Sequence, residues 1–368
     1  MSVVPQDPQR ILPNPLNPLR LGAGRSHDAI MPSMQGLAQQ VQTARRTGAL
    51  FDGFQRGILS AQGQDRTRFL HNLMSHDIKG LVPGQGRPAC LLDRQGKILF
   101  ASIVHSRPNE LLLELDPSSI SSARKHLERY RISEVVEFRD LSEHLSILPL
   151  HGPAAPELLS RAWPGFQQPE QSLSHCEGPG GSGVQLLIRW DLFRMPGFHL
   201  WIQPTQLEAV RSRILSEGQA LGIIQAGPDL FETLRIETGV PWPGSEMDET
   251  VILNELGTEE FISFTKGCFV GQEIVARIKY RAHPPRLLAG LLLEGSEIPA
   301  KGSPIELESQ IVGVITSACL SPTLQRPIAL GFLKYGTEAT HQLTVRTPSG
   351  PAHAKISKLP FVPVSPSS

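Results

Sequence analysis

The 368-residue chain lacks the features that would point to a membrane or to nucleic acid. Its 35 basic and 35 acidic residues give a formal net charge of +0, so no overall electrostatic attraction to either partner is expected. No apolar run approaches the ~20 residues needed to span a bilayer. The N-terminal stretch 1–23 is rich in Pro and Asn and lacks the apolar core of a secretory signal. We therefore predict a cytoplasmic protein with neither nucleic acid nor membrane as a partner.

Cysteine is also scarce. The four cysteines are Cys90, Cys176, Cys268 and Cys319, and none lies near another in the sequence. This spacing provides no CxxC pair for a metal or redox site. It argues against a permanently bound iron–sulfur cluster or a structural zinc, and a cytoplasmic setting argues against disulfides. We therefore predict no metal site.

One cysteine lies in a segment whose residues favour a reactive thiol. The stretch 266–273 reads Lys-Gly-Cys-Phe-Val-Gly-Gln-Glu. A thiol acts as a nucleophile or metal ligand only as the thiolate, and Lys266 supplies a positive charge near Cys268. Apolar residues at helical spacing in 272–279 predict a helix that starts near Gly271, whose free N–H groups would add a partial positive charge. The alternative is a small buried cysteine.

The arrangement of apolar segments and turns predicts an α+β chain of several units. At 368 residues the chain is too long for one simple core. The strand-helix-strand-strand-helix order of its middle part is typical of a ferredoxin-like unit. After residues 284–285, short apolar strands separated by turns predict a small β-barrel. We expect a flexible tail at 1–47, a first α+β unit at 48–144, a ferredoxin-like unit at 145–245, a Cys-containing segment at 246–285 and the barrel at 286–360.

Several of these segments resemble known proteins. The string at 266–273 resembles the signature of the YgfZ-type folate-binding proteins. These are relatives of the aminomethyltransferase (T-protein, GcvT) of the glycine cleavage system and of a mitochondrial iron–sulfur assembly factor. Gly-x-Asp-Arg-x-x-Phe-Leu at 63–70 and Leu-Leu-Asp-x-x-Gly-Lys at 91–97 resemble the first half of the T-protein. The resemblance covers roughly residues 48–360 and implies a T-protein-like fold: two α/β, ferredoxin-like halves followed by a small β-barrel.

The resemblance also implies a folate cavity between the two halves, with tetrahydrofolate or a derivative as the cofactor. The element Arg235 to Gly239 resembles the Arg-x-Glu-x-Gly element beside the folate site of T-proteins. Arg235 could bind a carboxylate, Glu237 could accept hydrogen bonds from a pterin, and a structural Arg–Glu pair is the alternative. Trp242 could stack on an aromatic ring. The candidate cofactor-binding residues are Arg235, Glu237, Trp242, Gln272 and Glu273.

One part of the T-protein pattern is missing. T-proteins carry an acidic pair shortly after the Gly of the first hairpin, and one Asp of the pair activates the folate nitrogen. Phe100 and Ala101 stand near those positions here. Neither side chain can hold an amine in the required protonation state. We therefore expect no glycine-cleavage chemistry.

Taken together, the resemblance implies a tetrahydrofolate-binding accessory protein that supports assembly or repair of iron–sulfur enzymes. Its partners would be a folate and iron–sulfur client or assembly proteins. Cys268, assisted by Lys266, would act at the rim of the folate cavity as a nucleophile or a transient cluster ligand. A folate-dependent aminomethyl or one-carbon transferase is the alternative function, and an interaction scaffold with a vestigial pocket is a third.

Overall fold

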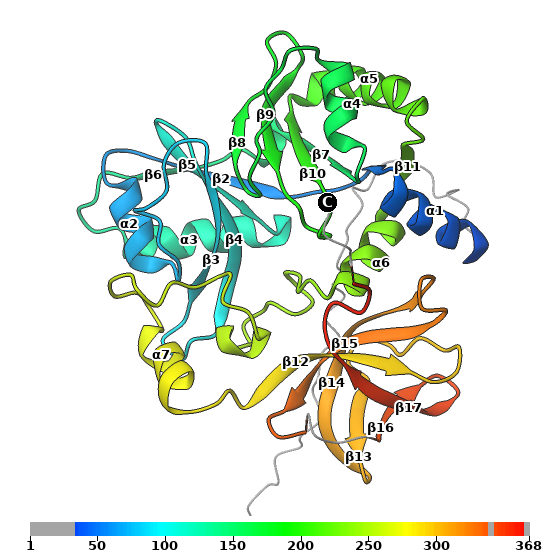
Figure 1. The fold of residues 1–368 in the computed structure, drawn as a ribbon. Helices are drawn as coiled ribbons and strands as arrows, with labels where there is room; N and C mark the ends of the chain where they lie inside the picture. The colour runs from blue at the N-terminus through cyan, green and yellow to red at the C-terminus, as the bar shows by residue number, and fades with distance from the viewer. Residues whose placement is uncertain (1–33, 338–341, 364–368) are drawn as a thin grey trace, which may run out of the picture.

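The computed structural model describes residues 34–337 and 342–363. Two open sheets and one closed barrel organise this part of the chain. In Figure 1 the two α/β units lie side by side above the barrel. The expected mixed α/β fold with a C-terminal β-barrel is therefore confirmed. No helix in the described part of the chain has the length and apolar character required to cross a bilayer.

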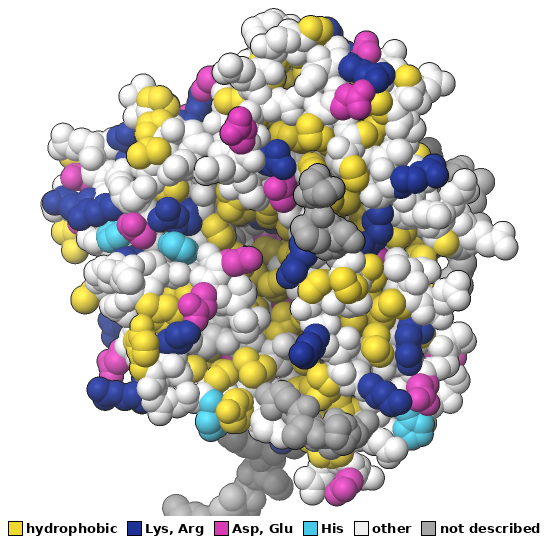
Figure 2. All heavy atoms as spheres, viewed as in Figure 1, with side chains coloured by type: hydrophobic (Ala, Val, Ile, Leu, Met, Phe, Trp, Pro, Cys, Tyr) yellow, Lys and Arg dark blue, Asp and Glu magenta, His cyan; other side chains and the backbone are white. Residues whose placement is uncertain are grey.

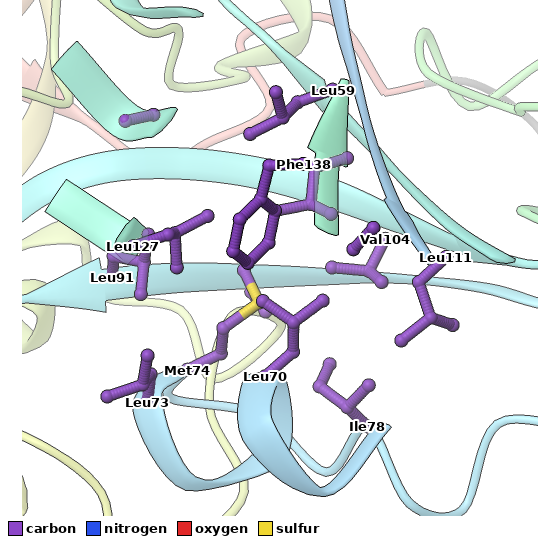
Figure 3. Packing of buried hydrophobic residues seen from close by; sticks show 14 of the residues in the cluster. Leu59, Leu70, Leu73, Met74, Ile78, Leu91, Val104, Leu111, Leu127 and Phe138 are labelled. Atoms are coloured by element: carbon purple, nitrogen blue, oxygen red, sulfur yellow. The ribbon is translucent and has the colours of Figure 1, made fainter. Parts of the chain in front are cut away.

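The first α/β unit surrounds a core that Figure 3 shows from close by. Its elements are β2 (Gly57–Gln62), α2 (Arg66–Leu73), β3 (Gly86–Leu92), β4 (Ile98–Ser106), β5 (Glu110–Leu115), η1 (Pro117–Ser119), α3 (Ile120–Tyr130), β6 (Glu137–Asp140) and η2 (Ser142–His144). The strands form an antiparallel sheet with the order β3-β4-β5-β2-β6. Leu70 of α2 and the adjacent Met74 lie beside Phe138 of β6, and all three are buried (Figure 3). Burying each such side chain contributes roughly 1.5–3 kcal/mol, so α2 is held by its apolar face.

The second α/β unit contains a six-stranded sheet. Its elements are α1 (Met34–Arg46), β1 (Ala49–Phe51), β7 (Ser146–His151), α4 (Ala155–Ala162), β8 (His175–Glu177), β9 (Val184–Arg189), β10 (Gly197–Ile202), η3 (Pro204–Gln206), α5 (Leu207–Gln219), β11 (Ile224–Ala226) and α6 (Pro228–Thr238). The strand order is β11-β1-β7-β10-β9-β8. Leu158 of α4 and Ile214 of α5 are fully buried and belong to the core that these helices form with the sheet.

Two of the expected boundaries need correction near the start of the chain. The tail expected at 1–47 contains α1, whose residues Val41 and Ala44 are buried; residues 1–33 lie outside the described part. The first unit does not start at residue 48, because β1 pairs with β7 and β11 of the second sheet. Residues 52–56 then carry the chain from the second sheet to the first.

The Cys-containing segment packs against the turn of the β3–β4 hairpin. Its elements are η4 (Leu253–Leu256) and α7 (Gln272–Arg281). Buried Val275 of α7 packs in one cluster with Leu92 and Ile98 of the hairpin. Gly271 has a left-handed φ of +83°, and a Cβ at this position would lie 2.5 Å from the Asp93 carbonyl oxygen. Only glycine therefore allows α7 to start this close to the hairpin.

The C-terminal unit is a closed barrel. Its strands are β12 (Arg286–Leu293), β13 (Pro304–Leu307), β14 (Gln310–Ser321), β15 (Arg326–Lys334), β16 (Leu343–Thr347) and β17 (Gly350–Ser357). They close in the order β12-β15-β14-β13-β16-β17. Ile305, Ile315 and Val345 belong to its buried interior. A closed barrel has no unpaired edge strand, so this unit can meet the other two through its side chains.

Candidate functional site

A cavity of about 720 Å³ lies where the two α/β units, the Cys-containing segment and the barrel meet. Figure 2 shows the face on which hydrophobic side chains, with Lys and Arg side chains near them, gather in the hollow between the units. The lining includes Arg56, Arg87, Ala101, Ser102, Trp190, Asp191, Arg194, Trp242, Phe261 and Leu288. These residues come from every structural unit. The cavity therefore exists only when all units are packed together.

Two indole rings form an aromatic part of the wall. Trp190 and Trp242 lie nearly parallel, with an interplanar angle of 16° and a centroid separation of 6.3 Å. Trp242 is buried, and Phe231 packs edge-on against its ring at 5.3 Å. Aromatic faces of this kind suit flat ring ligands. Trp242, expected beside a ligand, is therefore placed in the cavity lining, and its contact with a ring stays a prediction.

Arg56 is the charged group most deeply enclosed at the wall. Its Nε donates to Glu114 Oε1 at 3.0 Å, and its guanidinium lies 5.4 Å from the centroid of the Trp242 ring. Glu114 is fully buried on β5, and its Oε2 lies 3.3 Å from His105 Nε2. Burial alone would raise the pKa of Glu114, but the hydrogen bond to His105 and the charge of Arg56 lower it to about 2. Glu114 is therefore a carboxylate that holds Arg56 in place.

Buried histidines surround this ion pair between the two sheets. The rings of His105 and His175 lie edge to face at 5.5 Å. His199 Nε2 lies 3.3 Å from His151 Nε2. Burial lowers the pKa of His199 to about 4 and that of His175 to about 3, so both are neutral near pH 7. No local pattern in the sequence predicts this cluster, because its members come from strands that are distant along the chain.

Arg235 lies in a different buried cluster, outside the cavity lining. Its Nη1 donates to Glu246 Oε2 at 3.0 Å and to the Val240 carbonyl oxygen at 2.9 Å. Its Nη2 donates to Ser317 Oγ of β14 at 2.7 Å, and it also pairs with Glu232. Burial alone would lower the pKa of Arg235, but these carboxylates raise it. Arg235 therefore joins α6 to the barrel, and its expected place beside a ligand stays a prediction.

Glu237 has a similar position at the end of α6. It is fully buried and accepts hydrogen bonds from Arg45 Nη2 at 2.8 Å and from Ser321 Oγ at 2.5 Å. Thr323 Oγ1 donates to its second oxygen at 3.1 Å. Its carboxylate thus connects α1, α6 and the barrel. Arg235 and Glu237 do not pair with each other: Arg235 pairs with Glu246, and Glu237 pairs with Arg45. The expected contact of Glu237 with a ligand stays a prediction.

The Cys268 segment lies outside the cavity lining. Cys268 is exposed, and Gln272 and Glu273 begin α7. The Lys266 ammonium donates to the carbonyl oxygens of His71 and Met74 at the end of α2. Cys268 is therefore not one of the residues that line the cavity, and its place at the rim stays a prediction.

Lys266 and Cys268 are nevertheless close enough to interact electrostatically. Burial lowers the pKa of Lys266 to about 8, and Asp77 and Cys268 partly oppose this shift. Phe261 lies in the cavity wall, and the chain from it to Cys268 can span at most ~24 Å. Cys268 therefore lies within that distance of a residue in the cavity wall.

The cavity wall at β4 carries no carboxylate. Ala101 and Ser102 line the cavity, and Phe100 packs against the first core. The carboxylates of the lining are Asp191 and Glu260. Asp191 accepts hydrogen bonds from Arg189 Nε at 3.1 Å and from the backbone N–H of Gly197 at 3.2 Å. Within the described residues, no group of three His, Cys, Asp or Glu side chains could hold a metal ion.

Comparison with known proteins agrees with this architecture. The chain matches the GCVT N-terminal domain over residues 28–266 and the glycine cleavage T-protein C-terminal barrel domain over residues 286–363. It is 28% identical to a protein named aminomethyltransferase from Rubrobacter xylanophilus, over 89% of this chain and 86% of the relative. A second such protein, from Streptomyces coelicolor, is 28% identical over 82% of this chain and 83% of the relative.

A solved structure shares the fold. The glycine cleavage system aminomethyltransferase T from Bartonella henselae superposes with a TM-score of 0.79 at 20% identity, covering 89% of this chain and 90% of that chain. At this identity the likeness concerns the fold alone. The matches to both domains, over most of its length, show that the chain belongs to the GCVT family.

Proposed function

We propose that this protein binds a tetrahydrofolate derivative in its central cavity and supports the assembly or repair of iron–sulfur enzymes through Cys268. The cavity is the observation that carries the first part. Its volume of about 720 Å³ falls in the range of small-molecule sites, and its wall combines an aromatic surface with a few polar groups. The family of the chain and the names of its relatives favour a folate as the ligand.

The accessory role rests on the Cys268 segment. The thiol is exposed, and the half-buried Lys266 ammonium interacts electrostatically with it. Because Cys268 lies outside the cavity lining, a bound folate would leave it free to meet a partner protein. We therefore assign ligand binding and thiol chemistry to separate places on the molecule.

A folate-dependent transferase is the second candidate. The relatives named aminomethyltransferase favour it. The sequence of β4 opposes it, because Phe100 and Ala101, which stand near the positions of the T-protein acidic pair, offer no carboxylate. The accessory role accommodates both the family membership and this missing acid.

Anaerobic calorimetric titration with tetrahydrofolate tests the binding step. We expect micromolar binding by the wild type and by Cys268→Ala, with Cys176→Ala as a control for a half-buried cysteine. Only Cys268→Ala should then fail to restore iron–sulfur enzyme activity in cells that lack the protein. Absence of folate binding would contradict the proposal. Consumption of methylene-tetrahydrofolate with an amine or thiol acceptor would favour the transferase instead.

A further inference from the structure

Arg56 uses only part of its hydrogen-bonding capacity within the protein. Nε is bound to Glu114, whereas no described residue accepts a hydrogen bond from Nη1 or Nη2. The Arg56 side chain is only 4% exposed, and the residue lines the cavity. Neither Nη1 nor Nη2 is among the fully buried side-chain atoms that lack a hydrogen-bond partner, so each keeps some accessible surface. The two terminal donors therefore have access to the cavity, and a ligand acceptor could reach them.

The charge of this guanidinium is already balanced. Glu114 is a buried carboxylate that contacts both Arg56 and His105. A ligand carboxylate on Arg56 would place a second negative charge beside Glu114 in a largely desolvated site, which is unfavourable. A neutral carbonyl oxygen could accept from the Nη groups without adding charge. The part of the cavity next to Arg56 therefore suits a neutral hydrogen-bond acceptor.

The part of the cavity wall beside Arg56 also suits a flat aromatic ring of a ligand. Arg56 and Trp242 are adjacent, and both are buried. Trp190 extends the aromatic surface beside Trp242. A flat ring lying on the indoles would present its edge to the guanidinium. Carboxylates of the same ligand would remain better hydrated near the exposed Arg194, which also lines the cavity.

We propose that Arg56 is a ligand-binding residue whose Nη groups donate to a neutral carbonyl oxygen on a flat heteroaromatic ring lying against Trp242. Glu114, supported by His105, is the positioning residue that fixes the guanidinium. The inference rests on the proposed function, since the carbonyl of a reduced pterin is the acceptor that a tetrahydrofolate would supply. It adds a recognition residue from the segment that connects the two sheets.

Two ligands with the same pterin ring, one with and one without the glutamate tail, distinguish the Arg56 contact from contacts made by the tail. Tetrahydrofolate and tetrahydropterin, which lacks the p-aminobenzoyl-glutamate tail, would be titrated anaerobically by calorimetry. The variant Arg56→Met/Glu114→Gln removes both charges, so no buried carboxylate is left unpaired. We expect its affinity to fall by the same factor, ~10- to 100-fold, for both ligands, as for loss of a charge-assisted hydrogen bond. A matched control, Arg286→Met/Glu255→Gln, removes a part-buried Arg–Glu pair outside the cavity lining and should leave both affinities unchanged.

Glu114→Gln alone tests the positioning role. It keeps a side chain of the same shape and an acceptor for Arg56 Nε, so we expect a ~3- to 10-fold loss for both ligands with an unchanged circular dichroism spectrum. A purely structural role would change the unfolding midpoint and not the affinity of the folded protein.

The possible outcomes also distinguish the two proposals. If Arg56→Met/Glu114→Gln binds tetrahydropterin like the wild type, this inference is overturned and folate binding is not. A loss for tetrahydrofolate alone would place the contact on the tail carboxylates and would also overturn it. If the wild type binds tetrahydropterin but not tetrahydrofolate, only the folate proposal fails. Binding of neither ligand by the wild type overturns both.

Discussion

Two buried arginines, in two regions of the molecule, show how differently the same side chain can be used. Arg235 lies at the junction of α6 and the barrel, where Glu232, Glu246, Val240 and Ser317 accept its hydrogen bonds. Arg56 lies at the junction of the two sheets, where, among the described residues, only its Nε has an acceptor. The first arginine is saturated by the protein, and the second has two donors left at the cavity wall.

The difference teaches that burial of an arginine does not by itself mark a binding site. A saturated guanidinium stabilises the packing of the units around it, because every donor has a partner. A guanidinium that is held by one carboxylate and still has free donors is preorganised for a ligand. Arg235 attracts attention in the sequence through its resemblance to a known motif, whereas Arg56 is identified by its surroundings.

The largest expected effect comes from removing the saturated arginine. Arg235→Met leaves Glu246 buried without its cationic partner, which should lower the free energy of unfolding by about 3–5 kcal/mol. Denaturant unfolding followed by circular dichroism measures this loss. Arg124→Met, which breaks an exposed pair with Glu128 on α3, should cost no more than about 0.5 kcal/mol. Similar losses in the two variants would remove the distinction drawn for Arg235.

Removing the partly used arginine should cost less. Arg56→Met leaves Glu114 with His105 as a remaining partner, so we expect a loss of about 2–3 kcal/mol of unfolding free energy. The double variant Arg56→Met/Glu114→Gln should recover part of this loss, since no buried charge remains. Chemical denaturation of the single and double variants provides the comparison. A double variant less stable than the single one would contradict the assigned pairing.

Acidification should weaken the region between the sheets. The pKa of His199 is lowered to about 4, so folding favours its neutral form. The contribution of this neutral form to the free energy of unfolding is fully present above pH 6.5 and is lost as the pH falls from 6.5 towards 4. Glu114, with its pKa of about 2, adds a second loss only as the pH falls from 4.5 towards 2. His199→Gln should reduce the slope of stability against pH in the upper window by up to about 1.4 kcal/mol per pH unit. Urea midpoints measured from pH 4 to 7 would show it, and an unchanged slope would refute the role of His199.

The smallest effect is expected at the thiol that carries the sequence motif. Cys268 is exposed, so Cys268→Ser should change the free energy of unfolding by no more than about 0.5 kcal/mol. Cys90 is fully buried, and burial raises the pKa of its thiol. Cys90→Ser should therefore cost about 1–3 kcal/mol through burial of a hydroxyl. Equal losses at the two positions would mean that the Cys268 segment is packed more closely than described.

Local patterns in the sequence were sufficient to predict most of the helices and strands. The apolar spacing after Gly271 predicted α7, and the short strands after residue 285 predicted the barrel. Helix α1 was missed although Leu37, Val41 and Ala44 have the spacing of one helical face. That helix was readable, because its signal is local. The strand β1 was not assigned to the correct sheet, since the choice of its neighbours depends on residues more than 90 positions away.

The sequence by itself determined most of the elements and the thiol segment, because helical and strand periodicities and turn residues act over a few neighbouring residues. Only the tertiary structure decided which charged side chains meet. Arg56 and Glu114 are 58 positions apart, and no spacing rule links them. Nor could the motif around Arg235 show that the barrel supplies a partner for it 82 positions away. The cavity depends on such long-range contacts, because its wall combines residues from all the units.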